Sequence, residues 1–169
     1  MTNSQKTYCL DANVLIQAWQ KYYAPRFCPT YWEVLNTLGK RGVIFLPELV
    51  YEEIVRTEDD LSKWVKSSDI EIRKMDESVT FCLKHIFDAN PIHKHLVDNI
   101  RGRSQADPWV IAHAIKENAI VVTKEKKITA ASSKRIRIPN VCDNMGIKCI
   151  DDFQMITELG LTFSCTIGK

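Results

Sequence analysis

The sequence predicts an α/β fold in which a central, mostly parallel sheet lies between two layers of helices. Short apolar runs, of the length of strands buried on both faces, recur along the chain. Segments in which apolar residues repeat at helical spacing separate these runs, and strands that alternate with helices are typical of parallel sheets. We therefore expect a three-layer α/β/α sandwich, formed by residues 1–169 as a single domain.

Apolar runs mark the expected strands of this sheet. They are Tyr8–Leu10, Val43–Leu46 and Ala119–Val122, and Lys148–Ile150 is expected to form a fourth, short strand. Ile70 and Ile72 alternate with charged residues, a pattern that fits either a short edge strand or a loop. The number of strands therefore depends on which of these two structures forms around Ile70.

The expected helices lie between and after these runs. The first helix covers 13–22, and the second runs from a capping box at Thr30–Glu33 to Gly39 or Gly42. Pro47 starts the third, the fourth covers 58–65, Asp76 caps the fifth, and the sixth covers 90–100. A capping box at Ser104–Asp107 opens the seventh, and the last runs from Asp151 to Gly160. Residues 124–139 are basic and rich in small residues, and we expect an irregular segment there.

Composition favours a globular protein of the cytoplasm. Hydrophobic residues make up 45% of the chain and charged residues 26%, and no apolar run approaches the roughly 20 residues that cross a bilayer. The six cysteines form no CxxC pair, so we expect small buried side chains in a reducing compartment rather than a zinc site or disulfides. A net charge of +2 is too small to indicate a nucleic-acid binder by itself.

Carboxylates stand beside the ends of several predicted elements. They are Asp11 after the first strand, Glu52 or Glu53 in the helix after the second, Asp107 at the start of the helix before the third, and Glu125 two residues beyond Thr123. Such positions converge at the carboxyl edge of a parallel sheet. Crowded carboxylates repel one another unless a divalent cation lies between them, and hard oxygen ligands favour Mg²⁺ or Mn²⁺. Alternatively, Asp11 only caps the helix that follows it.

Four stretches that contain these acids are YCLDANVLI, FLPELVYEEI, QADPWVIAHA and IVVTKEK. In this order they resemble the acidic motifs of the PIN domain, the nuclease fold of VapC-type toxins, ribosome-processing endonucleases and, more distantly, flap nucleases. The resemblance spans most of the chain and includes an ADPW motif and a later IPNVC motif, features of a little-characterised bacterial and archaeal PIN-like branch. It implies a metal-dependent ribonuclease in which Asp11, the glutamate and Asp107 hold the metal.

Two positions depart from the family pattern or leave it ambiguous. The last acid of the family is often an Asp two residues after a Thr, whereas Glu125 stands here, and Asp143 is the alternative for that place. Glu52 and Glu53 point about 100° apart on a helix, so only one of them faces a cleft squarely. We prefer Glu53, which precedes the apolar Ile54 as the family's glutamate precedes an apolar residue.

Further residues are expected to support the site. Asn13 is placed to orient a carboxylate or a metal-bound water, and Thr123 to donate a hydrogen bond from the end of its strand. A basic run beside the expected cleft is a candidate for binding the phosphate backbone of RNA, although such runs are usually solvated loops. It consists of Lys124, Lys126, Lys127, Lys134, Arg135 and Arg137.

The sequence thus predicts a PIN-like endoribonuclease that uses Mg²⁺ or Mn²⁺ to activate a water for attack on an RNA phosphodiester. By analogy with the family, we expect the toxin of a toxin–antitoxin pair, with RNA, an antitoxin protein and a second copy of the chain as partners and no membrane. The alternative is a catalytically silent PIN-like module that binds RNA or protein. A phosphohydrolase of the haloacid dehalogenase type ranks last, because it needs a second Asp where Asn13 stands.

Overall fold

A single parallel sheet forms the centre of the molecule. The computed structural model describes residues 6–97, 105–130 and 135–168, and within them five strands lie in the order β3-β2-β1-β4-β5. The strands are β1 (Tyr8–Leu10), β2 (Ile44–Pro47), β3 (Glu71–Arg73), β4 (Ile120–Val122) and β5 (Cys149–Ile150). All four pairings are parallel, and the central strand β1 places Tyr8 beside Ile44 on one side and Ile120 on the other.

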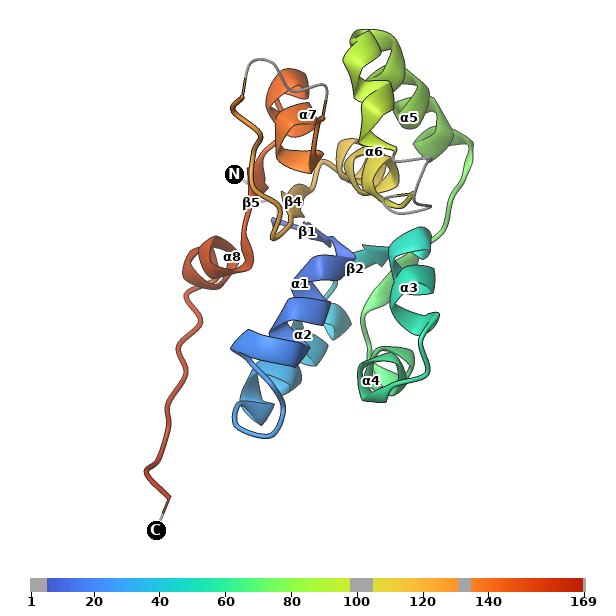
Figure 1. Ribbon diagram of the computed structural model, residues 1–169. Helices are drawn as coiled ribbons and strands as arrows, with labels where there is room; N and C mark the ends of the chain where they lie inside the picture. The colour runs from blue at the N-terminus through green and yellow to red at the C-terminus, as the bar shows by residue number, and fades with distance from the viewer. Residues whose placement is uncertain (1–5, 98–104, 131–134, 169) are drawn as a thin grey trace, which may run out of the picture.

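Helices cover both faces of this sheet (Figure 1). They are α1 (Ala12–Gln17), continued by the π-helix η1 (Ala18–Tyr22), α2 (Pro29–Lys40), α3 (Glu48–Val55), α4 (Asp60–Ser67), α5 (Glu77–Ala89), the 3-10 helix η2 (Pro91–Leu96), α6 (Asp107–Glu117), α7 (Ile138–Met145) and α8 (Asp152–Glu158). Figure 1 shows α1 to α4 on one side of the sheet and α5 to α7 on the other. The expected three-layer α/β/α architecture is therefore confirmed.

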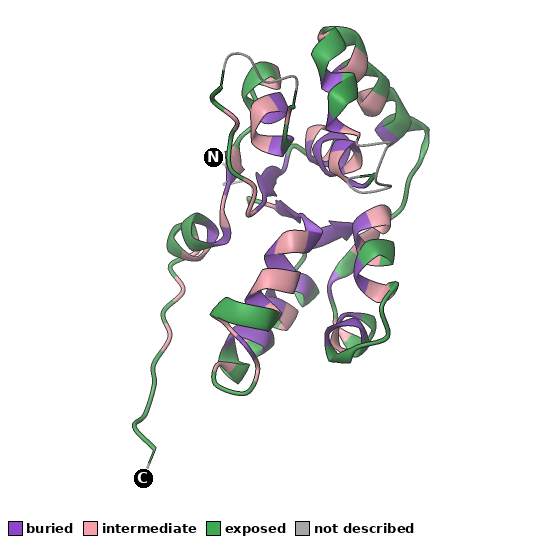
Figure 2. Ribbon diagram, in the orientation of Figure 1, coloured by how far each residue is buried: buried purple, intermediate pink, exposed green. Residues whose placement is uncertain are grey.

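The core lies between the sheet and these helices. The residues of β1, β2 and β4 are buried, as strands covered on both faces must be, and Figure 2 shows these central strands buried while the helices turn one side to solvent. The sheet is thus a rigid base for whatever side chains follow the carboxyl ends of its strands. None of the helices that the structure describes is long and apolar enough to span a membrane.

One edge of the sheet resolves an ambiguity of the sequence. Ile72 lies in the edge strand β3, which pairs with β2, so the alternating pattern forms a strand rather than a loop. Just before this strand, the chain passes very close to α2 at Gly39. A Cβ atom on Gly39 would lie 2.7 Å from the Cα of Ile70, so the helix and the strand approach each other only because this residue has no side chain.

Of the two predicted capping boxes, the one at Thr30–Glu33 is wrong, and the one at Ser104–Asp107 begins outside the described residues. The helix α2 begins at Pro29 with Cys28 as its cap, so Thr30 lies inside the first turn and caps nothing. Proline favours the first helical position because its φ is already helical. Ser104 lies outside the described residues, and α6 begins at Asp107 behind Ala106, which makes no side-chain capping bond. Asp76 and Asp151, in contrast, cap α5 and α8 as predicted.

Two further segments differ from the expectation. The predicted helix over 90–100 is a 3-10 helix that ends at Leu96, and residues 98–100 lie outside the described part. The expected irregular segment 124–139 ends earlier than predicted, because α7 begins at Ile138. Within the described residues of this segment, no helix or strand precedes α7. The structure therefore adds one helix that the sequence interpretation left out.

Candidate active site

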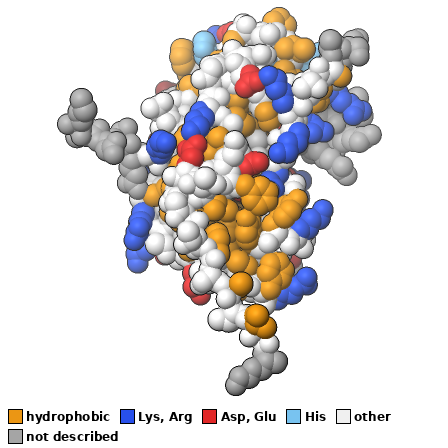
Figure 3. All heavy atoms as spheres, turned by 90° about the vertical axis from the view of Figure 1, so that its left-hand side faces the viewer, with side chains coloured by type: hydrophobic (Ala, Val, Ile, Leu, Met, Phe, Trp, Pro, Cys, Tyr) orange, Lys and Arg blue, Asp and Glu red, His pale blue; other side chains and the backbone are white. Residues whose placement is uncertain are grey.

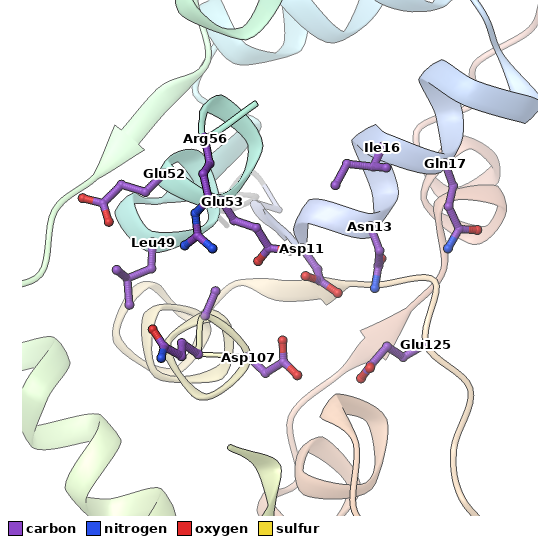
Figure 4. A pocket seen from close by; sticks show the side chains of 12 residues that line it. Asp11, Asn13, Ile16, Gln17, Leu49, Glu52, Glu53, Arg56, Asp107 and Glu125 are labelled. Carbon is purple, nitrogen blue, oxygen red and sulfur yellow. The ribbon is translucent and has the colours of Figure 1, made fainter. Parts of the chain in front are cut away.

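A cleft opens at the carboxyl end of β1, between α1, α3 and the start of α6. It encloses about 480 Å³. Figure 4 shows the side chains that line it. They are Asp11, Asn13, Ile16, Gln17, Leu49, Glu52, Glu53, Arg56, Gln105, Ala106, Asp107 and Glu125. All four preferred carboxylates from the sequence interpretation therefore line one cleft, although they come from segments far apart in the chain.

Asp11 lies at the bottom of this cleft, directly after β1. It is only 4% exposed, and its Oδ2 accepts a hydrogen bond from the Thr123 hydroxyl at 2.7 Å. Burial raises the pKa of Asp11 to about 7, the Thr123 hydroxyl opposes this rise, and the charges of Glu125 and Glu53 add to it. Asp11 occupies the cap position of α1, but its side chain makes no capping hydrogen bond. The view of Asp11 as a mere helix cap is therefore wrong.

Thr123 and Asn13 join the ends of β1 and β4 into one hydrogen-bonded unit. The Asn13 amide nitrogen donates to the Thr123 hydroxyl oxygen at 3.2 Å, and the backbone N–H of Glu125 donates to the same oxygen at 3.1 Å. The Asn13 carbonyl oxygen accepts from the backbone N–H of Lys124 at 2.8 Å. The side chains of Thr123 and Asn13 thus hold the loop after β4 against Asp11. Both residues occupy the supporting positions that the sequence predicted.

Glu125 is fixed in the cleft by the helix that the sequence interpretation missed. Its Oε2 accepts a hydrogen bond from the backbone N–H of Ile138, the first residue of α7, at 3.0 Å. A carboxylate is favoured there because the first N–H groups of a helix have no partner inside it. Asp143 lies further along α7, pairs with the Lys127 ammonium, and is not among the residues that line the cleft. The geometry therefore favours Glu125 over Asp143.

The two neighbouring glutamates of α3 differ in direction. Figure 4 shows the Glu53 carboxylate turned toward Asp11 and the Glu52 carboxylate turned away from it. Burial raises the pKa of Glu53, and the nearby Arg56 guanidinium opposes this rise. The charge of Glu53 also adds to the raised pKa of Asp11, which burial chiefly causes. Glu53 is thus the better placed member of the pair.

Asp107 completes the group from the opposite wall. It is the first residue of α6, and Figure 4 shows its carboxylate directed into the space that Asp11, Glu53 and Glu125 surround. The fixed backbone angle of Pro108, the next residue, helps to start this helix where the side chain of Asp107 faces the cleft. The direction of the Asp107 side chain therefore depends on where α6 begins.

The donor set of the cleft suits a hard divalent cation. Carboxylate oxygens are the ligands that Mg²⁺ and Mn²⁺ prefer. Burial is the main reason why the pKa of Asp11 is raised, and a cation would offset both this burial cost and the repulsion from Glu125 and Glu53. Among the described residues, no group of three or more His, Cys, Asp or Glu side chains lies close enough together to enclose a metal ion. Mg²⁺ usually keeps several of its waters and binds few carboxylates directly, so the cleft fits a hydrated ion.

Comparison with known proteins places this geometry in a family. A family model described as a domain of unknown function (DUF4411) matches residues 8–163. The chain belongs to this family. The match includes every residue that lines the cleft, from Asp11 to Glu125.

A solved structure shares the fold of this family member. A chain in the crystal structure of VapBC2 from Rickettsia felis, bound to a DNA fragment from their promoter, matches it with a TM-score of 0.52 and 22% sequence identity. The match covers 86% of this chain and 98% of that chain. No curated protein matches in sequence. The fold is therefore PIN-like, as the motifs indicated.

The basic run is less accessible to RNA than the sequence suggested. The Lys124 ammonium is buried and pairs with Asp152 at 2.5 Å, so its placement on the RNA-facing surface is wrong. Lys126 pairs with Asp151 at 3.5 Å, Lys127 pairs with Asp143, and the Arg137 guanidinium donates to a backbone carbonyl at 3.5 Å. Arg135 is exposed and has an interaction of its own, and Lys134 lies outside the described residues.

Arg56 is the charged residue of the cleft that sequence reasoning missed. Of the described side chains that line the cleft, it is the only cation. It lies three residues after Glu53, and residues at this spacing share one face of a helix. This spacing from Glu53 was therefore the signal in the sequence that could have predicted Arg56 beside the carboxylates.

Proposed function

We propose that the chain is a metal-dependent endoribonuclease that hydrolyses RNA phosphodiester bonds in the cleft at the end of β1. One observation carries this proposal: Asp11, Glu53, Asp107 and Glu125 come from four separate segments, yet they line a single cleft. A chain without a use for these acids would gain nothing from placing repelling carboxylates together, since burial raises the pKa of Asp11 and the charges of Glu125 and Glu53 raise it further.

The cleft residues have separate tasks in this proposal. Asp11, Asp107 and Glu53 would hold the hydrated cation directly or through its waters, and Glu125 would do so directly or through a water. Bound Mg²⁺ or Mn²⁺ supplies an activated water and stabilises the charge on the leaving oxygen. Thr123 keeps Asp11 in place through its hydroxyl, and the Ile138 N–H keeps Glu125 in place. Arg56 adds a cation that suits an RNA phosphate at the rim of an otherwise acidic cleft.

The biological setting follows from the fold of the relatives and is also a proposal. A VapC-like nuclease acts in the cytoplasm as the toxin of a toxin–antitoxin pair, bound by an antitoxin protein and paired with a second copy of itself. The six cysteines, none of which forms a disulfide, suit a reducing compartment. Co-purification of the chain with an antitoxin from its own operon, and its molar mass in solution, would test these partners.

A silent binding module is the second candidate function. It is favoured by the finding that, within the described residues, no three metal-binding side chains are close enough to enclose an ion. A module of this kind would bind RNA through the same fold without cutting it.

Cleavage of unstructured RNA separates the two candidates. The purified chain is incubated with end-labelled RNA in Mg²⁺, in Mn²⁺ and in EDTA. The nuclease proposal predicts cleavage in either metal and none in EDTA, with 5′-phosphate and 3′-hydroxyl ends, since water attacks the phosphorus. Intact RNA in both metals would favour the silent module.

A further inference from the structure

An exposed aromatic pair lies outside the cleft and has no role in the proposed chemistry. Tyr22 at the end of η1 is 45% exposed, and Phe153 in the first turn of α8 is 46% exposed. Their rings contact each other edge to face, with centroids 5.7 Å apart and planes at 82°. Figure 3 views the molecule from the side that carries α8 in Figure 1, and it shows hydrophobic side chains gathered on this face.

A buried lysine holds the two rings in place. The Lys124 ammonium lies 4.3 Å from the centroid of the Tyr22 ring and 3.9 Å from that of Phe153. It also pairs with Asp152 at 2.5 Å, and the two charged side chains are only 7% and 0% exposed. Because the lysine is neutralised and buried, it does not itself attract a ligand from solvent. It instead fixes the orientation of the exposed rings, which lowers the entropy lost when something stacks on them.

The aromatic pair and the cleft share two stretches of chain. Gln17 lines the cleft, and Tyr22 follows it by five residues in the continuous helix of α1 and η1, roughly 7 Å along a helix axis. Lys124 directly precedes Glu125, which also lines the cleft. A single-stranded chain that leaves the cleft along η1 therefore meets the rings within a short distance.

The charges near the rings favour an anionic ligand. Lys21, beside Tyr22, is exposed. Lys126 lines the same surface hollow as Phe153, and although it pairs with Asp151 at 3.5 Å, its side chain stays 79% exposed. The acids of that hollow have partners: Asp151 accepts from the Gln154 N–H at 2.9 Å, and Glu158 pairs with Lys148 at 2.5 Å. Flat rings with cations beside them suit the bases and phosphates of a single strand.

We propose that Tyr22 and Phe153 form a stacking platform for an unpaired base of single-stranded RNA whose backbone continues into the cleft. The inference rests on the proposed function, since it places the substrate of the same site. An aromatic face accepts any base, so the platform anchors the strand without selecting a sequence. A duplex keeps its bases stacked inside, so the platform favours unpaired RNA.

Binding of a short RNA in EDTA tests the platform without any cleavage. The probe is a fluorescein-labelled oligoadenylate of about eight nucleotides, a length within the span of single-strand binding sites, followed by fluorescence anisotropy with the wild-type chain and its variants. Tyr22→Leu and Phe153→Leu keep an apolar side chain but remove the ring, and each should weaken binding by about fivefold or more. Tyr22→Phe keeps the ring and should bind within about twofold of the wild type. Phe81→Leu is the matched control, because Phe81 is 73% exposed on α5 and belongs neither to the cleft nor to the aromatic pair.

The outcomes separate this platform from the nuclease itself. If both leucine variants melt like the wild type and bind the oligoadenylate as tightly as Phe81→Leu does, the platform is refuted. The same conclusion follows if they change only the oligomeric state, since the rings are then a protein contact. If the chain cuts RNA but the leucine variants bind the oligoadenylate like Phe81→Leu, only the platform is refuted and the nuclease proposal stands. Ring-dependent binding by a chain that never cuts RNA would keep the platform and remove the nuclease.

Discussion

Replacing Asp11 with asparagine should stabilise the metal-free protein above neutral pH. In the folded chain, burial raises the pKa of Asp11 from 3.8 to about 7. Between these two values the folded chain keeps the proton while the unfolded chain releases it, so the stability of the wild type falls as the pH rises toward 7. At about 1.4 kcal/mol for each pH unit, the cost reaches at most about 4 kcal/mol and then stays constant at higher pH.

The Asp11→Asn substitution removes this cost and keeps the local contact. The side-chain carbonyl oxygen of the variant still accepts the hydrogen bond that the Thr123 hydroxyl donates in the wild type at 2.7 Å. The variant should therefore lose the pH dependence that Asp11 contributes, and its advantage over the wild type should grow from about pH 4 to about pH 7 and then stay constant. Added Mn²⁺ should reverse the order at about pH 8, because the ion binds the ionised carboxylate of the wild type.

Urea unfolding in EDTA at several pH values measures this difference. Asp143→Asn is the control, since it removes a carboxylate that does not line the cleft. The reasoning fails if Asp11→Asn and the wild type lose stability in parallel over the range from about pH 5 to about pH 8, or if the control gains as much as Asp11→Asn does.

Three further predictions concern Glu53 and Glu125 in the cleft and Gly39 in α2. Glu53→Gln should reduce RNA cleavage far more than Glu52→Gln does, because only Glu53 turns toward Asp11 in Figure 4; equal losses in a cleavage assay would contradict this. Glu125→Gln should lower cleavage and raise the Mn²⁺ concentration needed for half-maximal rate, and an unchanged metal requirement would remove Glu125 from the site. Gly39→Ala should destabilise the fold by about 1–3 kcal/mol in urea unfolding, because its Cβ would meet the backbone of Ile70 at 2.7 Å; wild-type stability would show that α2 shifts freely.

Much of the fold was readable from the sequence, because buried parallel strands leave a local signature. The runs Tyr8–Leu10 and Ala119–Val122 are apolar in every position, and both contain strands at the centre of the sheet. The cleft followed from the same logic, since acids that end or flank such strands must meet at one edge. Local pattern therefore predicted which carboxylates line the cleft, while their catalytic role stays a proposal.

The parts that the sequence did not predict depend on proline geometry or on distant partners. Thr30 matched a capping box, but Pro29 had already started α2. Proline at position 139 and apolar residues at 138, 141, 142 and 145 were usable signals for α7, but residues 124–139 were interpreted as irregular and no element was assigned to 140–147. The burial of Lys124 had no local signal, because its partner Asp152 lies 28 residues away.

The central claim is that the cleft holds a divalent cation for cutting RNA, and Asp107→Asn tests it most directly. Asparagine keeps the size of the side chain and one acceptor oxygen but removes a negative charge from the ring of carboxylates. The measurement pairs RNA cleavage in Mn²⁺ with thermal melts of the wild type and the variant, each with and without Mn²⁺. The claim predicts that cleavage falls by orders of magnitude, that the metal-free melting temperature holds or rises, and that the Mn²⁺-induced rise shrinks. A variant that cuts RNA like the wild type, with an unchanged Mn²⁺-induced rise in melting temperature, would contradict it.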